Sequence, residues 1–365
     1  MINQLDADFD STFVCDPNGI DGIPSHKFKN SQRVVDSKCH SLMGFIYQPR
    51  TVSHCVFSGD EAFVFLANPN HLSTWLGAII VRIRGKRAVF WGHGFLSPTK
   101  STKNYLRKIF FSLANDFYTY GWRAKKNAIS FGFSPSRVHV GFNSLDYGNQ
   151  LVFRERLLRT PCAATPRGFL KVSCISRLTT ICRYDLLLEA AAMAGRKGVL
   201  VEIDFVGEGP AMDQLILLAN ELDLKCVFHG AIYDEERISE ILFNADVTVS
   251  PGKVGLTAMH SLMFGTPVIT HDNFDSQMPE VESVFPGFTG YFFKEGSVED
   301  LAAKLEDVYY NASDRNEVRR HCFRMIDDLY NPLKQSEVMH AAVKGAIAAP
   351  GDDAFQMFKE PEACN

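Results

Sequence analysis

Residues 245–270, ADVTVSPGKVGLTAMHSLMFGTPVIT, show how the second half of the chain is built. Val247–Ser250 is a short apolar run typical of a buried strand, and a second such run covers residues 267–270. Between them, residues 258–264 have the composition of a helix, which ends at Gly265-Thr266-Pro267. A strand, a helix and a further strand in this order predict a parallel α/β unit.

The loop between this first strand and the helix is suited to binding an anion. Its glycines let several backbone N–H groups point at one place, and the N-terminus of the helix adds a positive partial charge. We expect the amides near Gly255 and Leu256 to bind the diphosphate of a nucleotide sugar, with Lys253 as an additional cation. His260, which lies just inside the helix, is expected near the ribose.

The same alternation of apolar strands and amphipathic helices extends over nearly the whole chain. Further strands are predicted at residues 11–15, 62–67, 88–91, 117–120, 138–141, 170–175, 200–206 and 226–229. Further helices are predicted at residues 72–81, 104–114, 121–131, 185–194, 211–222, 234–244, 301–310, 317–329 and 333–346. This pattern predicts an α/β protein with two doubly wound parallel sheets.

Proline and glycine between residues 160 and 168 interrupt the periodicity and predict a domain boundary. The expected parts are residues 1–165, residues 166–330, and residues 331–365, a helix that returns to the first domain followed by a tail. Ligands of such folds bind beyond the carboxyl ends of the strands, so we expect a site in a cleft between the two halves.

Two other loops are predicted to reach the same edge of the second sheet. Arg177 follows the strand at 170–175, with Arg183 close behind it, and a cation there is placed to meet a diphosphate. An ion pair with a surface carboxylate is the alternative role for Arg177. Gly207 and Gly209 follow the strand at 200–206, where they allow a close approach to a ligand, although a tight strand-to-helix turn also explains them.

The order of these motifs resembles the retaining glycosyltransferases of family 4, which have the two-domain GT-B fold. The matching residues are Arg177-Leu178, Gly207-Glu208-Gly209-Pro210, Phe228-His229-Gly230, residues 245–251, Gly255-Leu256 and residues 265–269. The likeness is strongest from about residue 170 to residue 290. It implies a nucleotide diphosphate sugar as donor, a glycan or lipid-linked acceptor, and a setting in polysaccharide biosynthesis.

Three positions depart from the pattern of that family. The family usually has two glutamates eight positions apart, and the matching residues here are Gly252 and His260. A histidine can still hydrogen-bond a ribose hydroxyl, whereas a glycine offers no side chain to a sugar. The family's usual lysine falls on Cys182. The first domain also begins later than in related enzymes, so its N-terminal part looks shortened.

The first half of the chain supplies the candidate residues for the acceptor side. Phe90-Trp91-Gly92-His93-Gly94 ends a predicted strand, and the resemblance implies that His93 faces the donor sugar or positions the acceptor. A buried or helix-capping histidine is the alternative. Asn68 and Asn70 follow the strand at 62–67 and are candidates for contact with the acceptor.

Composition excludes several other classes of protein. The chain is 46% hydrophobic and 22% charged with a net charge of −4, which argues against a dedicated nucleic-acid binder. Nine scattered cysteines without CxxC spacing favour reduced thiols in a cytoplasmic protein, with no metal site. No run approaches the roughly 20 apolar residues of a membrane span. The basic run 82–87 suggests peripheral contact with the inner face of a membrane, or simply a solvated helix end.

We therefore expect a glycosyltransferase that works with retention and without a metal or other cofactor. His93 and Arg177 are the expected catalytic residues. The donor side is assigned to Arg183, Gly207, Gly209, Lys253, Gly255, Leu256 and His260. The alternatives are an inactive nucleotide-sugar-binding partner protein and a GT-B sugar-nucleotide epimerase, which would need a pair of acid–base carboxylates.

Overall fold

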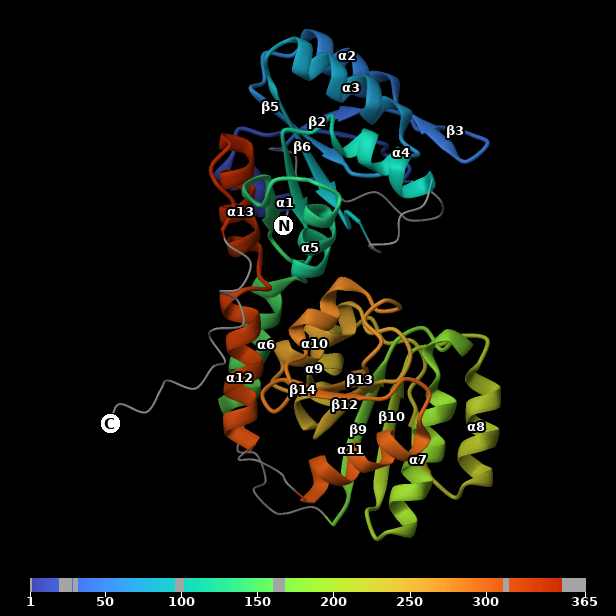
Figure 1. Ribbon diagram of the computed structural model, residues 1–365. Helices are drawn as coiled ribbons and strands as arrows, with labels where there is room; N and C mark the ends of the chain where they lie inside the picture. Colours follow the sequence, from blue (N-terminus) through green and yellow to red (C-terminus); the bar gives the residue numbers. More distant parts are fainter. Residues whose placement is uncertain are drawn as a thin grey trace, which may run out of the picture. The chain divides into compact units, whose positions relative to one another are not determined.

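The computed structural model describes residues 2–19, 28, 32–95, 102–159, 168–310 and 315–349, which form two compact units (Figure 1). The first unit combines residues 1–142 with residues 332–365, and the second comprises residues 143–331. Among the described residues, no helix is long and apolar enough to cross a membrane.

The first boundary lies before the one expected near residue 165 because helix α6, Tyr147–Arg159, is part of the second unit. The Arg154 guanidinium donates to both carboxylate oxygens of Asp327, at 3.0 and 2.9 Å, and the Tyr147 hydroxyl donates to the same carboxylate at 2.9 Å. The residues from 332 onward belong to the first unit.

The second unit has a six-stranded parallel sheet in the order β11-β10-β9-β12-β13-β14. Its strands are β9 Leu170–Ile175, β10 Val201–Val206, β11 Lys225–Phe228, β12 Val247–Ser250, β13 Val268–His271 and β14 Gly290–Phe293. The order reverses between β9 and β12, as in a doubly wound fold, so the loops after these two strands flank the switch point.

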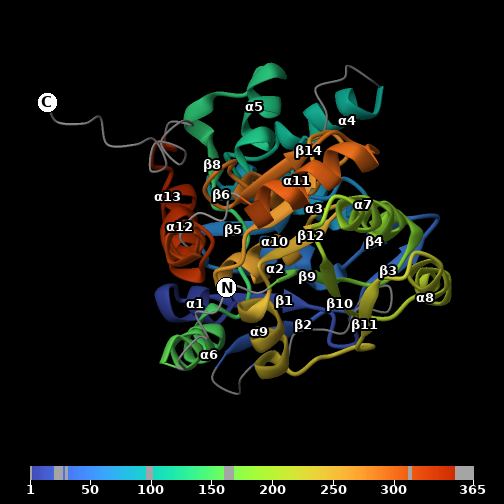
Figure 2. The ribbon, with the colours of Figure 1, turned by 90° about the horizontal axis from the view of Figure 1, so that it is seen from below.

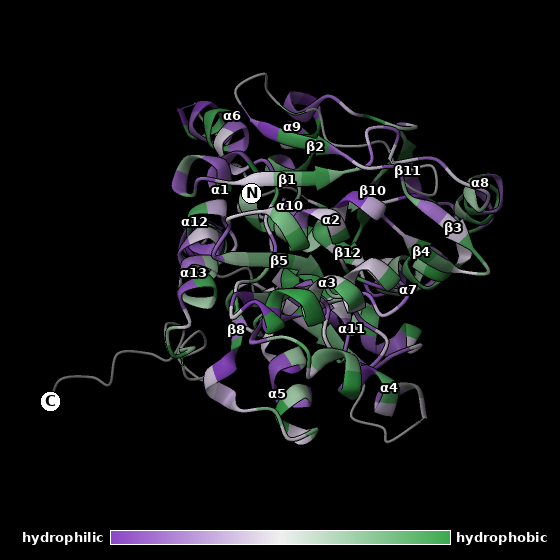
Figure 3. Cartoon of the chain, turned by 90° about the horizontal axis from the view of Figure 1, so that it is seen from above, coloured by the Kyte–Doolittle hydropathy of each residue, from purple (hydrophilic) through white to green (hydrophobic). Residues whose placement is uncertain are grey.

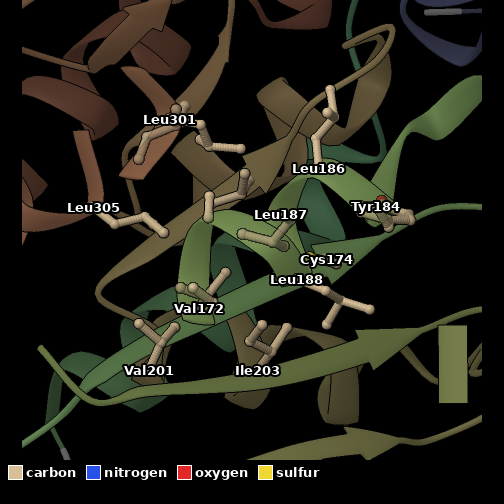
Figure 4. Packing of buried hydrophobic residues seen from close by; sticks show 14 of the residues in the cluster. Val172, Cys174, Tyr184, Leu186, Leu187, Leu188, Val201, Ile203, Leu301 and Leu305 are labelled. Atoms are coloured by element: carbon tan, nitrogen blue, oxygen red, sulfur yellow. The ribbon is translucent and has the colours of Figure 1, made fainter. Parts of the chain in front are cut away.

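Alternate residues of a strand point to opposite faces of the sheet, and both sets are mostly buried in the central strands. Helices therefore cover both faces of this sheet. On one face, Val172 and Cys174 of β9 join a buried cluster with α7, Tyr184–Arg196, and α11, Val298–Tyr310 (Figure 4). Helix α8, Met212–Glu221, lies beside α7 (Figure 2). Each fully buried Leu, Ile or Val stabilises such a core by about 1.5–3 kcal/mol.

On the opposite face, Ser173 of β9 shares a hydrogen bond with Thr248 of β12 at 2.7 Å. The Ser261 hydroxyl of α10 donates to the Thr248 hydroxyl at 2.6 Å, so α10 packs on that side. The remaining helices of this unit are α9 Glu235–Asn244, α10 Leu256–Met263 and α12 Arg315–Asp328. The sheet is therefore a buried platform that fixes the loops at its carboxyl edge.

The first unit has a four-stranded parallel sheet in the order β5-β6-β7-β8. These strands are Ala62–Leu66, Arg87–Gly92, Asp116–Thr119 and Val138–Val140. A separate parallel pair joins β1 Thr12–Cys15 to β2 Arg33–Asp36, and β3 His40–Leu42 forms a hairpin with β4 Phe45–Tyr47. The helices are α1 Ile2–Asp8, α2 Pro49–Phe57, α3 Leu72–Ile83, α4 Thr102–Phe111, α5 Trp122–Ser130 and α13 Pro332–Lys344.

Helix α13 closes the sheet of the first unit with residues from the far end of the chain. Its Met339 and Ala342 are fully buried with Val89 of β6 and Tyr118 of β7. The Gln335 side chain donates to the Phe142 carbonyl oxygen at 3.0 Å. The return of the chain to its first unit is thus held by apolar packing and by a buried hydrogen bond.

Candidate functional site

The loops after β9 and β10 meet at the carboxyl edge of the second unit's sheet. The Leu178 N–H donates to the Glu208 carbonyl oxygen at 2.9 Å, and the Ala211 N–H donates to the Leu178 carbonyl oxygen at 3.1 Å. These bonds continue the β9–β10 ladder beyond the ends of the strands. Arg177, which directly precedes Leu178 in the extension of β9, is thereby held beside the switch point.

Gly207 and Gly209 are required by this close approach of two backbones. Gly207 has a φ of +136°, and a Cβ atom on it would lie 1.9 Å from the Ser176 carbonyl oxygen. A Cβ atom on Gly209 would lie 2.1 Å from the Leu178 carbonyl oxygen. Both glycines therefore allow the loop after β10 to pack on the loop after β9, which is the tight-turn role expected as the alternative to ligand contact.

Gly252 joins the loop after β12 to the same cluster. Its N–H donates to the Cys182 carbonyl oxygen at 3.0 Å, and a Cβ atom on it would lie 2.0 Å from the Ile181 carbonyl oxygen. No side chain fits at this position unless the backbone moves. The glutamate that the resemblance to family 4 implies at this position therefore has no room between the two packed loops.

Two cations remain free around these loops. Arg177 and Lys253 are both exposed, and neither side chain has a hydrogen bond or ion pair within the part of the chain that the structure describes. Arg183 was expected to contact the donor. Its guanidinium donates to the Asp185 carboxylate at 3.0–3.1 Å. Arg177 and Lys253 are therefore the side chains available to an anion, whereas Arg183 is already paired.

Helix α10 begins at this edge, and its N-cap residue makes no side-chain capping hydrogen bond. Gly255 is the N-cap residue and provides no side-chain hydrogen bond, and Leu256 begins the helix with 45% of its surface exposed. The Thr257 hydroxyl donates to the Ile175 carbonyl oxygen at 2.8 Å, which ties the first turn to the end of β9. The first N–H groups of α10 are thus fixed beside the switch point, where they favour an anion.

Cys182 occupies a small polar cluster in the loop after β9. Its thiol donates to the Arg177 carbonyl oxygen at 3.2 Å and contacts the hydroxyls of Ser176 and Thr179 at 3.5 and 3.4 Å. The Ser176 hydroxyl also bonds the Tyr184 hydroxyl at 2.8 Å. Where the resemblance to family 4 implies a lysine, this chain therefore has a thiol that contacts the backbone carrying Arg177.

His260 lies in the second turn of α10 and has a hydrogen-bonding partner on α9. Its Nε2 atom lies 2.7 Å from Glu235 Oε1 at the start of α9, and the Gln150 amide donates to the same oxygen at 2.9 Å. Burial acts to raise the pKa of Glu235, but the hydrogen bonds and the charge of His260 outweigh it, so the pKa lies below its usual value. The expected ribose contact of His260 would have to coexist with this pair.

Restoring the family's glutamate at position 260 is expected to destabilise the protein. His260→Glu places a second carboxylate against Glu235, and we expect the free energy of unfolding to fall by about 1–3 kcal/mol. Urea denaturation measures this loss, with His260→Gln as the control that keeps a donor. Adding Glu235→Gln to His260→Glu is expected to recover most of the stability, and an unchanged loss would contradict the pairing.

Two residues of the site were not predicted from the sequence: His271 is the last residue of β13, and Gln277 lies in the loop after that strand. Gln277 accepts the Val254 N–H at 2.8 Å, and its amide donates to the Thr270 hydroxyl at 2.9 Å. His271 is 3% exposed, and its Nδ1 atom accepts the Asn273 N–H at 3.2 Å. In the sequence, these residues could have been found from their position at the end of a predicted strand and in the loop that follows it.

His271 gives the stability of this edge a pH dependence. Burial lowers the pKa of His271 from its usual value of about 6.5, and the nearby charges of Glu295 and Asp272 oppose this only in part. Above pH 6.5 both folded and unfolded states hold this histidine neutral, and below it the unfolded state takes up the proton first, so stability is lost as the pH falls.

The variant His271→Gln cannot titrate at this position. Its deficit in unfolding free energy relative to wild type is therefore expected to shrink when urea denaturation is repeated from about pH 7.5 to about pH 5.5. A deficit that stays constant over this range would show that His271 does not take part in the pH dependence.

The acceptor-side candidates lie together at the carboxyl edge of the first unit's sheet. His93 is exposed directly after β6, with its ring 4.9 Å from that of Tyr120. Asn68 uses its side chain within its own turn, where it accepts the Asn70 N–H at 3.0 Å. Asn70 is exposed, and its carbonyl oxygen accepts the Ile46 N–H at 2.9 Å. His93 and Asn70 therefore have side chains available to a ligand, and Asn68 supports the turn.

Asn143 is a further residue near this edge. Its side-chain oxygen accepts the Ser144 N–H at 3.0 Å. Its amide also donates to the buried carboxylate of Glu280 at 3.1 Å, in the short helix Pro279–Ser283. Asn143 thus anchors the start of the second unit to the segment after β13.

Part of the chain is similar to a known protein family, and the whole fold is similar to solved structures. Residues 165–322 match the family model described as glycosyl transferases group 1, whereas no curated protein sequence matches the chain. Among solved structures, HepE of Anabaena in complex with UDP is similar with a TM-score of 0.62 and 15% identity, over 82% of each chain.

Two further structures have the same arrangement. The lipopolysaccharide outer core galactosyltransferase WaaB gives a TM-score of 0.63 at 14% identity, over 87% of this chain and 85% of that one. A glycosyltransferase from Rickettsia africae gives a TM-score of 0.63 at 14% identity, over 86% and 85%. The chain therefore has the GT-B fold with two Rossmann-like domains, and residues 165–322 are similar to group 1 glycosyl transferases.

Proposed function

We propose that the protein transfers a sugar from a nucleotide diphosphate sugar to a hydroxyl of a glycan or lipid-linked acceptor, with retention and without a metal. The observation that carries this proposal is a pair of exposed cations, Arg177 and Lys253, on the two loops that flank the switch point, neither with a partner among the described residues. The family match at residues 165–322 covers both loops.

The chemistry needs stabilisation of the negative charge that develops on the departing diphosphate. The Arg177 guanidinium can hold two phosphate oxygens at once, and Lys253 adds a point charge. The N–H groups at the start of α10, near Gly255 and Leu256, add fixed dipoles. The donor proposed here is a uridine diphosphate sugar, because the similar HepE structures were solved with UDP, with UDP and glucose, and with UDP-glucose.

We assign the acceptor side to the first unit. His93 and Asn70 are exposed at the carboxyl edge of its sheet, where a sugar hydroxyl can be hydrogen-bonded by an imidazole or an amide. His93 is also the proposed contact to the transferred sugar. Variants of these two residues are expected to affect transfer more than nucleotide binding.

The test is a product assay on the full chain with UDP, GDP and ADP sugars and a panel of glycan and lipid-linked acceptors. Release of the nucleoside diphosphate must accompany a new glycoside, and proton NMR of its anomeric signal reports whether configuration is retained. Activity that persists in the presence of EDTA supports a metal-free site. A product of inverted configuration, or one lost with EDTA, would overturn the corresponding part of the proposal.

A second candidate function, a nucleotide-sugar-binding protein without catalysis, is favoured by two observations. Gly252 offers no side chain to a donor sugar and has no room for one, and His260 is paired with Glu235. Both changes remove a carboxylate that similar enzymes direct at the donor. Tight binding of a nucleotide sugar, with no product from any acceptor and no slow hydrolysis, would favour this second function.

A further inference from the structure

Helix α3 exposes a continuous apolar stripe on the first unit. Leu72, Leu76, Ile79 and Ile83 are 42%, 47%, 41% and 81% exposed, and their spacing of four, three and four residues places them on one side of the helix. The opposite side of α3 is buried. Figure 3 shows the hydrophobic residues along this helix. An exposed stripe of this kind marks a surface that binds a partner or a lipid.

Helix α4 extends the stripe into a wider face. Its Tyr105, Leu106 and Ile109 are 66%, 59% and 42% exposed. The two helices are neighbours, because the rings of Trp75 and Phe110 lie 4.9 Å apart and the Arg82 side chain donates to the Ser112 carbonyl oxygen at 3.0 Å. These seven exposed side chains define the α3–α4 face.

The helices of this face, and α2 beside them, carry charges of one sign. Helices α2, α3 and α4 contain no Asp or Glu, whereas Arg50, Arg82, Arg107 and Lys108 lie on them. Arg82 and Lys108 are exposed beside the apolar residues. An apolar surface on helices that carry cations and no carboxylates matches the boundary between acyl chains and anionic headgroups.

Most of the basic run at residues 82–87 serves the fold instead. Arg84 donates to the carbonyl oxygens of Cys55 and Ser58 at 2.5 and 2.7 Å. Arg87 forms an ion pair with the buried carboxylate of Asp116. The membrane contact that the sequence suggested for this run is therefore assigned to the apolar side chains of α3 and α4. Arg82 is the member of the run that lies beside them.

We propose that the α3–α4 face binds the surface of an anionic lipid bilayer, with its apolar side chains in the interface and its cations at lipid phosphates. Tyr105 has the amphipathic ring that favours the headgroup level. A second copy of the chain is a poorer occupant, because a two-fold contact would bring the same cations of both copies together. This inference does not depend on the proposed transferase activity.

The experiment is co-sedimentation of the full chain with vesicles of phosphatidylcholine alone and of phosphatidylcholine mixed with phosphatidylglycerol. Wild type is expected to bind the anionic vesicles at least tenfold better, and the double variant Ile79→Glu/Ile83→Glu is expected to lose about tenfold or more of that binding. Arg82→Ala/Lys108→Ala is expected to lose about fivefold per cation, mainly at low salt.

The matched control is Leu217→Glu, which places the same charge on a 63% exposed leucine of α8 in the second unit. It is expected to bind vesicles like wild type, and circular dichroism checks that all variants fold. Equal binding of wild type and Ile79→Glu/Ile83→Glu would overturn the proposal. A dimer in light scattering that the same double substitution splits would also overturn it, because the face would then belong to a second copy.

Discussion

Replacing Arg177 with alanine is expected to lower the rate of glycosyl transfer by about a hundredfold to a thousandfold. Arg177 is exposed at the switch point without a partner in the described residues, so its charge is available to the departing diphosphate. The loss should appear mainly in kcat, because the charge on the leaving group grows in the transition state. The measurement is a steady-state assay of nucleoside diphosphate release in the presence of an acceptor.

Two other arginines serve as controls for this result. Arg183→Ala is expected to cost less than about tenfold, because the guanidinium is held by Asp185 rather than free for a ligand. Arg196→Ala, at the far end of α7, removes an equally exposed cation and is expected to have no effect. Near-normal transfer by Arg177→Ala would remove this residue from the catalytic machinery.

Gly207→Ala is expected to destabilise the second unit by about 3 kcal/mol and to abolish nucleotide binding. The added methyl group would lie 1.9 Å from the Ser176 carbonyl oxygen, at a φ of +136° that alanine rarely adopts. The loop after β9 must then move, and Arg177 moves with it. Urea denaturation and calorimetric titration of the nucleotide measure the two effects.

The matched control is Gly195→Ala in α7, where a Cβ atom would meet nothing within 4 Å. This change is expected to stabilise the helix by about 0.5–1 kcal/mol and to leave binding unchanged. Gly252→Glu, which restores the family's carboxylate, is expected to behave like Gly207→Ala rather than to raise activity. A stable Gly252→Glu variant with normal binding would show that the loops after β9 and β12 do not pack as described.

The strands around the site could be predicted from the sequence because burial on both faces makes them apolar. Val247–Ser250 and Leu170–Ile175 are found at their predicted residues. Helix α6 was missed because its buried residues are Gln150 and Arg154, so its inward face carries no apolar period. Strand β14, Gly290–Phe293, was also missed, because only loops and the short helix Pro279–Ser283, with no amphipathic α-helix, separate it from β13.

The backbone of the site was easier to predict than its side-chain partners. Glycines and strand ends located the loops near Arg177 and Gly252 from local sequence alone. The partner of His260 lies 25 residues away in the chain, at Glu235, and only the packing of α9 beside α10 brings them together. Equally, nothing in the sequence distinguished Arg183, which is paired with Asp185, from Arg177, for which the described part of the chain holds no partner.

In the proposed function, the carboxyl edge of the second unit's sheet binds a nucleotide diphosphate. A thermal-shift screen of the full chain against UDP, GDP, ADP, CMP and their common sugar conjugates tests it most directly, because a ligand of the folded state raises the melting temperature with its concentration. We expect a shift with one nucleotide, UDP foremost, that is much reduced in Arg177→Ala and kept in Arg196→Ala. No shift with any nucleotide, or an equal shift in Arg177→Ala, would contradict the account.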